Sequence, residues 1–472
     1  MSKSYSPSRL QLGRLKKLTT DGNISPRVWS IEDTLTQIMP LCKKIGITRI
    51  SDITYLDRLC IPNYSSILPG TEDTIWVYSG KGTTRKHAKA SAIMESIERY
   101  CSLASTSTKN IIRGTYTQLS KQYNKVLHPD EVVEPTQRNY NDNESIIDFI
   151  SGFDLLKNEE VLVPAELVFS RYAAKPPSVR AFLYSHTNGL ASGNVLEEAI
   201  CHALCEVIER DAVSIAHLCA SSLPYSILER VTNSLTNLQN NKSELTRITG
   251  NEFVDDSSIY PDVDLSEILQ EFKPVKFLVD RFADTGISLL VKDITQKDIG
   301  IPTFVASSVE WITSDYGYFA IGYGTHLDAR IALIRAITEL SQTRAADIQG
   351  ARDDLKKIRY KENDEIYKRK WQFMPATSLK PKERSNKVMF SEINTYLRDD
   401  ILDDIKLILT RLKKSGLKRA IIVDLTNQNL GIPVVRAIVP GLETFEIARL
   451  FTSSEIFMGN RAKYHFQKLL QS

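Results

Sequence analysis

The amino-acid sequence predicts an α/β fold, and three observations support this prediction. Apolar residues recur with helical spacing over residues 84–103, 196–219, 328–348 and 394–415. Strand-like runs rich in β-branched residues lie at residues 287–292, 303–309, 419–424 and 434–439. A short pattern of Asp, an apolar residue and Thr, followed by Ile-Pro, occurs three times. Together they favour a single large domain built from repeated strand-strand-helix units.

The copies of the short pattern are spread along the chain. They begin at Asp52, Asp293 and Asp424, and their Ile-Pro pairs begin at Ile61, Ile301 and Ile432. This spacing predicts three similar strand-turn-strand units in the core. Because such short patterns also recur by chance, the repeat says nothing about function.

The overall charge excludes some classes of partner. The 472 residues carry 60 basic and 57 acidic side chains, a net charge of +3, which is too small to predict a nucleic-acid or membrane surface. No apolar run is long enough to span a membrane, and the basic N-terminus has no apolar stretch typical of a signal peptide. We therefore expect a cytoplasmic protein, with a flexible arm over residues 1–20 and one domain over residues 21–472.

The remaining composition indicates structure rather than chemistry. The six cysteines follow neither a metal-binding nor a disulfide spacing, so we interpret them as reduced core residues. The polar segments near residues 222–262 and 352–392 have the composition of surface excursions.

The segment LEEAICHALCEVIERDA, residues 196–212, predicts a helix that is buried on nearly every side. Its only polar stripe is formed by Glu198, His202, Glu206 and Glu209. Carboxylates on a buried helix face need cations close by. For His202, a core histidine bonded to a neighbouring carboxylate is the favoured interpretation.

Two other predicted helices carry similar polar stripes. Ser91, Glu95 and Glu98 share one face and are followed by Arg99. Arg335, Glu339 and Gln342 lie on an otherwise apolar surface. Any one stripe could be a solvated, salt-bridged face. Three in one chain favour a shared internal site.

If the helices converge, their acids would repel one another unless hard cations lay between them. The acids in question are Glu95, Glu98, Glu206, Glu209 and Glu339. Oxygen-only ligands favour magnesium. Glycine-containing loops precede all three helices and suit phosphate, although each alone is more often an ordinary turn. Arginines suited to the remaining phosphate oxygens are Arg27, Arg99, Arg210 and Arg335.

These segments resemble the YcaO family of ATP-dependent enzymes. The resemblance rests on the motifs S-x-x-x-E-x-x-E-R, N-x-x-x-E-x7-E-x-x-E-R and R-x-x-x-E-x-x-Q, and on IPVVRAIVPGLE, and it covers about residues 25 to 450. It implies a single YcaO-type catalytic domain around a central site for ATP and Mg²⁺.

The resemblance also implies roles for individual residues. The metal-binding set is Glu95, Glu98, Glu206, Glu209 and Glu339. The nucleotide contacts are Arg27, Thr34, Ser91, Arg99, Asn194, Glu198, Arg210, Arg335 and Gln342. The residues assigned to the transfer chemistry are Glu206, Arg210, Arg335 and Glu339.

Family members use ATP to phosphorylate the oxygen of a backbone amide, so that phosphate becomes the leaving group. The chain ends in HFQKLLQS and lacks the proline-rich tail common in azoline-forming members. The segment from Ser25 to Pro62 is similar to the thioamide-forming branch, which acts on a glycine of methyl-coenzyme M reductase and is frequently associated with a TfuA-type partner. An azoline-forming cyclodehydratase and a non-catalytic ATP-binding scaffold are the alternatives. The substrate, sulfur donor and general base stay open, as does a homodimer.

Overall fold

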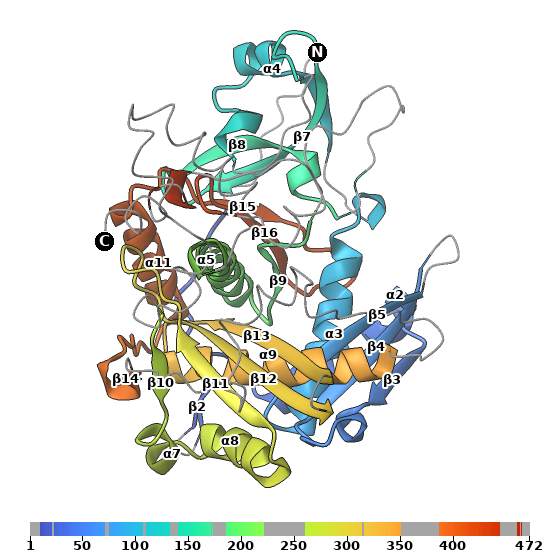
Figure 1. Cartoon of the computed structure of the whole chain (residues 1–472). Helices are drawn as coiled ribbons and strands as arrows, with labels where there is room; N and C mark the ends of the chain where they lie inside the picture. The colour runs from blue at the N-terminus through green and yellow to red at the C-terminus, as the bar shows by residue number, and fades with distance from the viewer. Residues whose placement is uncertain are drawn as a thin grey trace.

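The computed structural model describes residues 10–20, 23–70, 75–106, 110–132, 140–170, 172, 186–220, 260–313, 316–350, 387–443, 460–462 and 464. Three sheets of mainly antiparallel strands, each with a long helix packed on it, make up most of this part of the chain (Figure 1). Helix α5 (Leu196–Ala220) is seen end-on near the centre of Figure 1, between two of the sheets. The predicted α/β class is confirmed.

The first repeated unit contains strands β3 (Arg49–Asp52), β4 (Asn63–Pro69) and β5 (Ile75–Lys81), followed by helix α3 (Arg85–Cys101). The strands pair antiparallel in chain order, and α3 packs on β4 and β5. The Thr84 hydroxyl accepts the His87 N–H at 3.3 Å and so caps the helix. The short helices α1 (Ile31–Ile38) and α2 (Leu41–Ile45) also pack on α3.

The second unit repeats this order with longer elements. It contains β11 (Ser288–Asp293), β12 (Thr303–Thr313) and β13 (Tyr316–Thr325), followed by helix α9 (Ala329–Gly350). The additional strands β10 (Asp262–Asp264) and β14 (Lys387–Met389) and the helices α7 (Ile268–Glu271) and α8 (Lys273–Thr285) belong to the same part of the fold. The strands predicted at residues 287–292 and 303–309 are confirmed.

The third unit is assembled from two distant segments of the chain. Strands β15 (Ile421–Asp424) and β16 (Val434–Ile438) come late in the sequence, whereas their continuation, β9 (Leu190–Ser192) and helix α5, comes early. Antiparallel pairing of β16 with β9 joins the two pieces. The sheet continues through β7 (Ile146–Asp154), with β6 (Ile112–Thr115) and β8 (Glu159–Pro164) paired to it.

The Asp-apolar-Thr pattern forms the same turn in all three units. The backbone N–H of the Thr donates to the Asp side chain two residues earlier, at 3.0, 2.9 and 2.9 Å for Thr54, Thr295 and Thr426. The hydroxyl of the same Thr accepts the N–H of the first residue in the next strand, at 3.2, 2.9 and 3.2 Å for Asn63, Thr303 and Val434. Identical hydrogen bonds at all three places confirm the predicted repeat.

The three units close into a ring. Besides packing on its own unit, α3 packs on β9, α5 packs on β13, and α9 packs on β5. Each helix therefore lies at a seam between its own unit and the next. The polar stripes of the three helices are brought to these seams.

Glycines allow the helices to approach the strands very closely. A Cβ atom on Gly80 would lie 2.0 Å from the backbone nitrogen of Ala92, and one on Gly322 would lie 2.1 Å from that of Leu340. A Cβ on Gly193 would lie 2.5 Å from the Ala199 nitrogen. The glycines that the sequence suggested for phosphate loops thus serve helix–strand packing, because only a hydrogen atom fits at these contacts.

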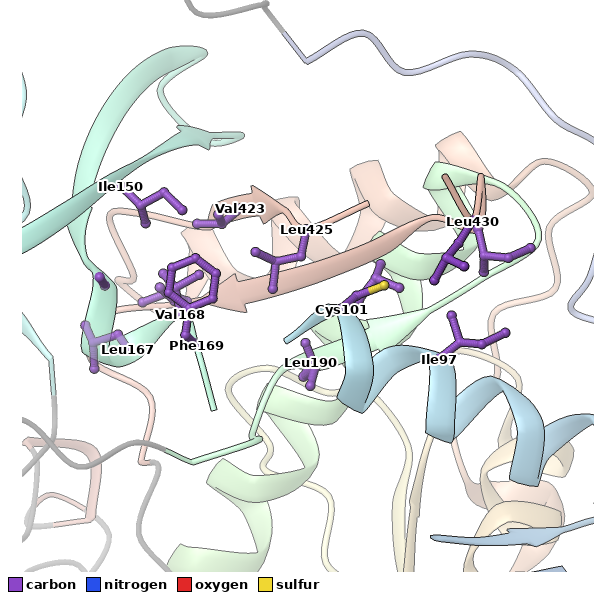
Figure 2. Packing of buried hydrophobic residues seen from close by; sticks show 14 of the residues in the cluster. Ile97, Cys101, Ile150, Leu167, Val168, Phe169, Leu190, Val423, Leu425 and Leu430 are labelled. Atoms are coloured by element: carbon purple, nitrogen blue, oxygen red, sulfur yellow. The ribbon is translucent and has the colours of Figure 1, made fainter. Parts of the chain in front are cut away.

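The apolar core lies between the helices and the sheets. Figure 2 shows Ile97 and Cys101 of α3 beside Leu190 and Leu430, which belong to the same buried cluster. Helix α5 contributes to a second cluster and packs on α11 (Ile401–Lys414), as its apolar sequence predicts. Helix α11 begins later than residue 394, where the sequence placed it, because the Asp400 carboxylate accepts the Leu402 N–H at 2.8 Å and caps the helix there.

Part of the segment expected to form a flexible arm packs on the domain instead. Lys17 forms a buried ion pair with Asp404, and the Ile401 N–H donates to the Leu15 carbonyl at 3.1 Å. Leu10 and Leu12 pack against the second apolar cluster. Apolar contacts and a buried charge therefore hold residues 10–18, while residues 1–9 lie outside the described part of the chain, as do most of the two predicted surface excursions.

The described cysteines form no disulfide, in agreement with the sequence interpretation. Cys42, Cys101, Cys201 and Cys205 are buried, and Cys60 is partly exposed. Cys219 lies in a stretch of α5 whose side chains are outside the description.

Candidate active site

The three polar stripes occupy equivalent positions of the repeat. The N–H groups of Gly82, Gly193 and His326 donate to the carbonyls of the three Ile-Pro prolines, at 3.3, 3.1 and 3.3 Å. These three residues are therefore equivalent, and they serve as the common origin from which positions in each unit are counted. Nine residues after this origin come Ser91, His202 and Arg335. Thirteen residues after it come Glu95, Glu206 and Glu339, and sixteen after it come Glu98, Glu209 and Gln342. The stripes predicted from the sequence are therefore one stripe that occurs three times.

The first acid group consists of Glu95, Glu98 and Glu206, with Arg99 among them. Arg99 lies 3.4 Å from Glu95 and 4.0 Å from Glu98, measured between charged nitrogen and oxygen atoms. Burial raises the pKa of Glu98 well above its usual value, and the charges of Glu206 and Glu95 raise it further. Burial also raises the pKa of Glu95. One arginine does not offset three carboxylates in this environment.

Two acids of this group accept hydrogen bonds from the backbone of β9 and of the turn before it. The Ser192 N–H donates to Glu98 at 3.1 Å, and the Gly189 N–H donates to Glu206 at 3.3 Å. Because Ser192 and Gly189 belong to the third unit, the Glu98 contact joins α3 to the neighbouring unit of the ring. The carboxylates are thus anchored on rigid elements.

The second acid group consists of Glu209 and Glu339, with Lys81 beside them. The Lys81 ammonium donates to one Glu339 oxygen, and the Tyr323 N–H donates to the other at 3.4 Å. Burial and the Glu339 charge raise the pKa of Glu209 to about 7. Burial alone would raise the pKa of Glu339, but Lys81 and Arg210 outweigh this effect and lower it.

Four further predicted residues meet at the edge of the site. Glu198 accepts the Val28 N–H at 2.7 Å, the Asn194 N–H at 3.0 Å and an Arg27 guanidinium N–H at 3.1 Å. The Thr34 hydroxyl donates to the Asn194 side-chain oxygen at 3.0 Å. Arg27 and Thr34 therefore lie beside Asn194 and Glu198, two other residues predicted to contact the nucleotide.

The other predicted residues lie on the same three helices. Gln342 donates to the Ser79 carbonyl of β5 and so links α9 to the first unit. Ser91 is partly exposed on α3, four residues before Glu95. Arg210 follows Glu209 on α5, and its charge acts on both acids of the second group.

His202 differs from the sequence interpretation. Its Nε2 atom lies 2.7 Å from the Arg335 guanidinium, not against a carboxylate. Burial lowers the pKa of His202 well below its usual value, and Arg335, Arg27 and Lys81 lower it further. The reason is that α5 faces Arg335 of α9 at the level of His202, and the acids of both helices lie one turn further along.

Sequence reasoning missed Lys81 as a site residue. Lys81 lies in the segment Ser-Gly-Lys-Gly-Thr, which was interpreted only as one of the glycine-containing loops that suit phosphate. The available signal was its position, since a lysine at the end of a strand that leads directly into an acid-bearing helix lies beside that helix's stripe.

The site can accept both cations and phosphate oxygens. Among the described residues of the site, three buried nitrogen atoms have no hydrogen-bond partner: Arg99 Nη1, His202 Nδ1 and Arg335 Nε. Buried donors of this kind suit anionic oxygens, and the five carboxylates suit hard cations. In the described part of the chain no three His, Cys, Asp or Glu side chains are already arranged to hold a metal ion. The donor set fits Mg²⁺ chemically, with Lys81 and Arg99 now neutralising part of its charge.

Comparison with known families identifies the fold. A family model described as the ATP- and Mg²⁺-binding YcaO cyclodehydratases matches residues 79–443, which is more than half of the chain. The chain belongs to the YcaO family. YcaO proteins are ATP- and Mg²⁺-dependent enzymes that act on peptide backbones, and the predicted family, fold and cofactors are confirmed.

Two relatives cover nearly the whole YcaO chain. An uncharacterized protein of Methanothermobacter thermautotrophicus is 34% identical over 432 residues, which are 89% of this chain and 96% of the relative. A protein encoded in the tfuA 3′ region of Rhizobium leguminosarum bv. trifolii is 29% identical over 416 residues, 87% of each chain.

Two solved structures share the YcaO fold. One is YcaO from Methanopyrus kandleri bound with AMPPCP and Mg²⁺, with a TM-score of 0.63 and 22% identity, covering 94% of this chain and 98% of that one. The other is a heterocyclase in complex with substrate and cofactor, with a TM-score of 0.69 and 21% identity. The similarity covers 97% of this chain but only 58% of the heterocyclase chain. Within the described residues, no helix is both long and apolar enough to cross a membrane.

Proposed function

We propose that this YcaO protein uses ATP to activate the oxygen of a backbone amide, and that a sulfide source then supplies the sulfur of a thioamide. The substrate is a glycine in a protein such as methyl-coenzyme M reductase. The amide, hydrogen sulfide and ATP become a thioamide, ADP and phosphate, so the amide oxygen leaves on phosphate and nothing is oxidised or reduced.

The observation that carries the proposal is the ring of five acids beside unpartnered N–H donors; Glu98 and Glu209 are buried, and the other three acids are partly exposed. The acids that would hold Mg²⁺ are Glu95, Glu98, Glu206, Glu209 and Glu339. Mg²⁺ bound there would neutralise charge on the phosphate chain. Arg99 and Arg335 carry two of the unpartnered donors and would orient the phosphate oxygens.

The edge of the site supplies the remaining contacts. Asn194 and Glu198, with Arg27 and Thr34 bonded to them, would bind the nucleotide away from the transferred phosphate. Glu198 is only 3% exposed, so its hydrogen bonds hold the side chains around it in place before the nucleotide binds.

Two relatives support the thioamide branch over azoline formation. One is encoded in a tfuA 3′ region, and the other comes from an archaeon, as do the methanogenesis-linked members of that branch. A TfuA-type protein is therefore the proposed sulfur-delivery partner. The similarity to a heterocyclase concerns the fold and keeps the cyclodehydratase as the second candidate.

Intact mass of a glycine-containing substrate tests the proposal. The substrate is incubated with this protein, ATP, Mg²⁺ and sulfide, with and without a TfuA-type partner. Exchange of oxygen for sulfur adds about 16 Da, whereas cyclodehydration removes about 18 Da. A loss of mass would assign the azoline reaction, and unchanged mass without phosphate release would point to a different substrate or to the non-catalytic scaffold.

A further inference from the structure

His202 lies where two of the three helices meet, outside the set of residues assigned to nucleotide or metal. It is on α5, one helical turn before Glu206, and its ring faces Arg335 of α9. Its Nδ1 atom is shielded from solvent. The hydrogen bonds of the ring determine what this atom can do.

The contact with Arg335 fixes the tautomer of His202. A guanidinium group has only N–H donors and stays protonated in proteins, so it cannot accept a hydrogen bond from the imidazole. The His202 Nε2 atom, 2.7 Å from Arg335 Nη2, is therefore the acceptor. A neutral imidazole that accepts at Nε2 carries its proton on Nδ1.

The Nδ1–H group is then a buried donor without an acceptor among the described residues. The charged side chains that act most strongly on His202 are those of Arg335, Arg27 and Lys81. Arginine and lysine side chains have no acceptor atom to offer. A buried donor in a cationic environment is suited to an anionic oxygen.

The repeat places His202 in a ring of donors. Its equivalents in the other units are Ser91 and Arg335, a hydroxyl and a guanidinium. All three precede by one turn the carboxylates Glu95, Glu206 and Glu339. The site therefore has a level of hydrogen-bond donors one helical turn before a level of carboxylates.

We infer that His202 is a further contact to the nucleotide: Arg335 holds its ring as the Nδ1–H tautomer, and this N–H donates to an oxygen of the phosphate chain. The inference rests on the nucleotide site and not on which reaction the activated amide undergoes. It makes Arg335 a positioning residue for His202 in addition to any contact of its own.

Three variants of His202 separate this role from simple packing. His202→Asn places an amide N–H close to the position of Nδ1 and loses the acceptor for Arg335. His202→Gln keeps an oxygen near the position of Nε2 and loses the Nδ1 donor. His202→Phe keeps the ring and removes both groups.

The measurement is the Kd of the non-hydrolysable analogue AMPPCP, determined by calorimetry with excess Mg²⁺, together with the melting temperature of each variant. We expect His202→Asn to bind within about threefold of the wild type. We expect His202→Gln and His202→Phe to bind about tenfold to a hundredfold more weakly, because a hydrogen bond to a charged group is lost.

Rescue by Gln but not by Asn would overturn the inference, since it would show that His202 serves only to seat Arg335. Unchanged AMPPCP affinity in the Phe variant would overturn it as well. Because AMPPCP binding is measured without substrate or turnover, failure of the thioamide proposal leaves this test unaffected.

Discussion

Glu209 offers the most direct test of the electrostatics of the acid ring. Glu209 is 3% exposed, and burial together with the Glu339 charge raises the pKa of its carboxyl from 4.5 to about 7. The folded state therefore binds a proton more tightly than the unfolded chain does. The resulting stabilisation is complete below pH 4.5 and is lost as the pH rises through about 7.

The magnitude follows from the size of the shift. A shift from 4.5 to about 7 corresponds to about 3 kcal/mol, since each pKa unit is about 1.4 kcal/mol. Glu209→Gln cannot ionise, so at pH 8 and without metal it should be more stable than the wild type by up to this amount. At pH 4.5 the two proteins should unfold alike.

The assay is thermal unfolding at pH 4.5 and pH 8, with EDTA and with Mg²⁺. At about 2.1 cal/mol/K per residue, 472 residues have an unfolding entropy of about 1 kcal/mol/K, so the variant should melt about 3 °C higher at pH 8 in EDTA. Mg²⁺ should raise the melting temperature of the wild type more than that of the variant. Glu144→Gln, at an exposed position, is the control and should match the wild type throughout.

The result that would refute this reasoning is a Glu209→Gln variant that melts at or below the wild type at pH 8 in EDTA. Such a result would mean that the Glu209 charge is already compensated by the cations around it. The acid ring would then need no added metal at this position.

Three further predictions concern the site and the repeat. Glu206→Gln and Glu339→Gln should each abolish Mg²⁺-dependent ATP turnover while circular dichroism stays unchanged, and full turnover in both would contradict the metal assignment. Thr295→Val should destabilise the protein by about 1–3 kcal/mol in denaturant titrations, because the buried Thr303 N–H loses its acceptor at 2.9 Å; an unchanged midpoint would remove the turn from the stabilising contacts. Gly322→Ala should lower the melting temperature or prevent folding, since its Cβ would lie 2.1 Å from a backbone nitrogen, whereas Gly350→Ala meets nothing within 4 Å and should be neutral.

The sequence predicted those parts of the fold that depend on patterns between residues close together in the chain. Helical spacing located α3, α5 and α9, and the Asp-apolar-Thr pattern located the turns that precede β4, β12 and β16. The third unit was not visible as a unit, because β9 and α5 precede β15 and β16 by more than two hundred residues. Only the pairing of β16 with β9 makes them neighbours, and pairing between distant segments leaves no local signal.

The sequence predicted which residues belong to the site, but not which of them contact one another. The acids and arginines stood out because charged residues on apolar helices require compensation. Which charge compensates which depends on the ring of units, so the contacts of His202 with Arg335 and of Lys81 with Glu339 could not be derived from spacing. Residues 10–18 were assigned to an arm on composition, although Lys17 is buried against Asp404.

Comparison of equivalent positions in the three units shows where the ring of acids is asymmetric. At the position sixteen residues after the common origin, the first and third units carry the acids Glu98 and Glu209, whereas the second unit carries Gln342. An acid in place of Gln342 would face the Ser79 carbonyl, to which the amide now donates, and would be repelled by it. The seam between α9 and β5 instead carries the ammonium of Lys81, which donates to Glu339. The three equivalent helices therefore carry different charges at equivalent positions of the repeat.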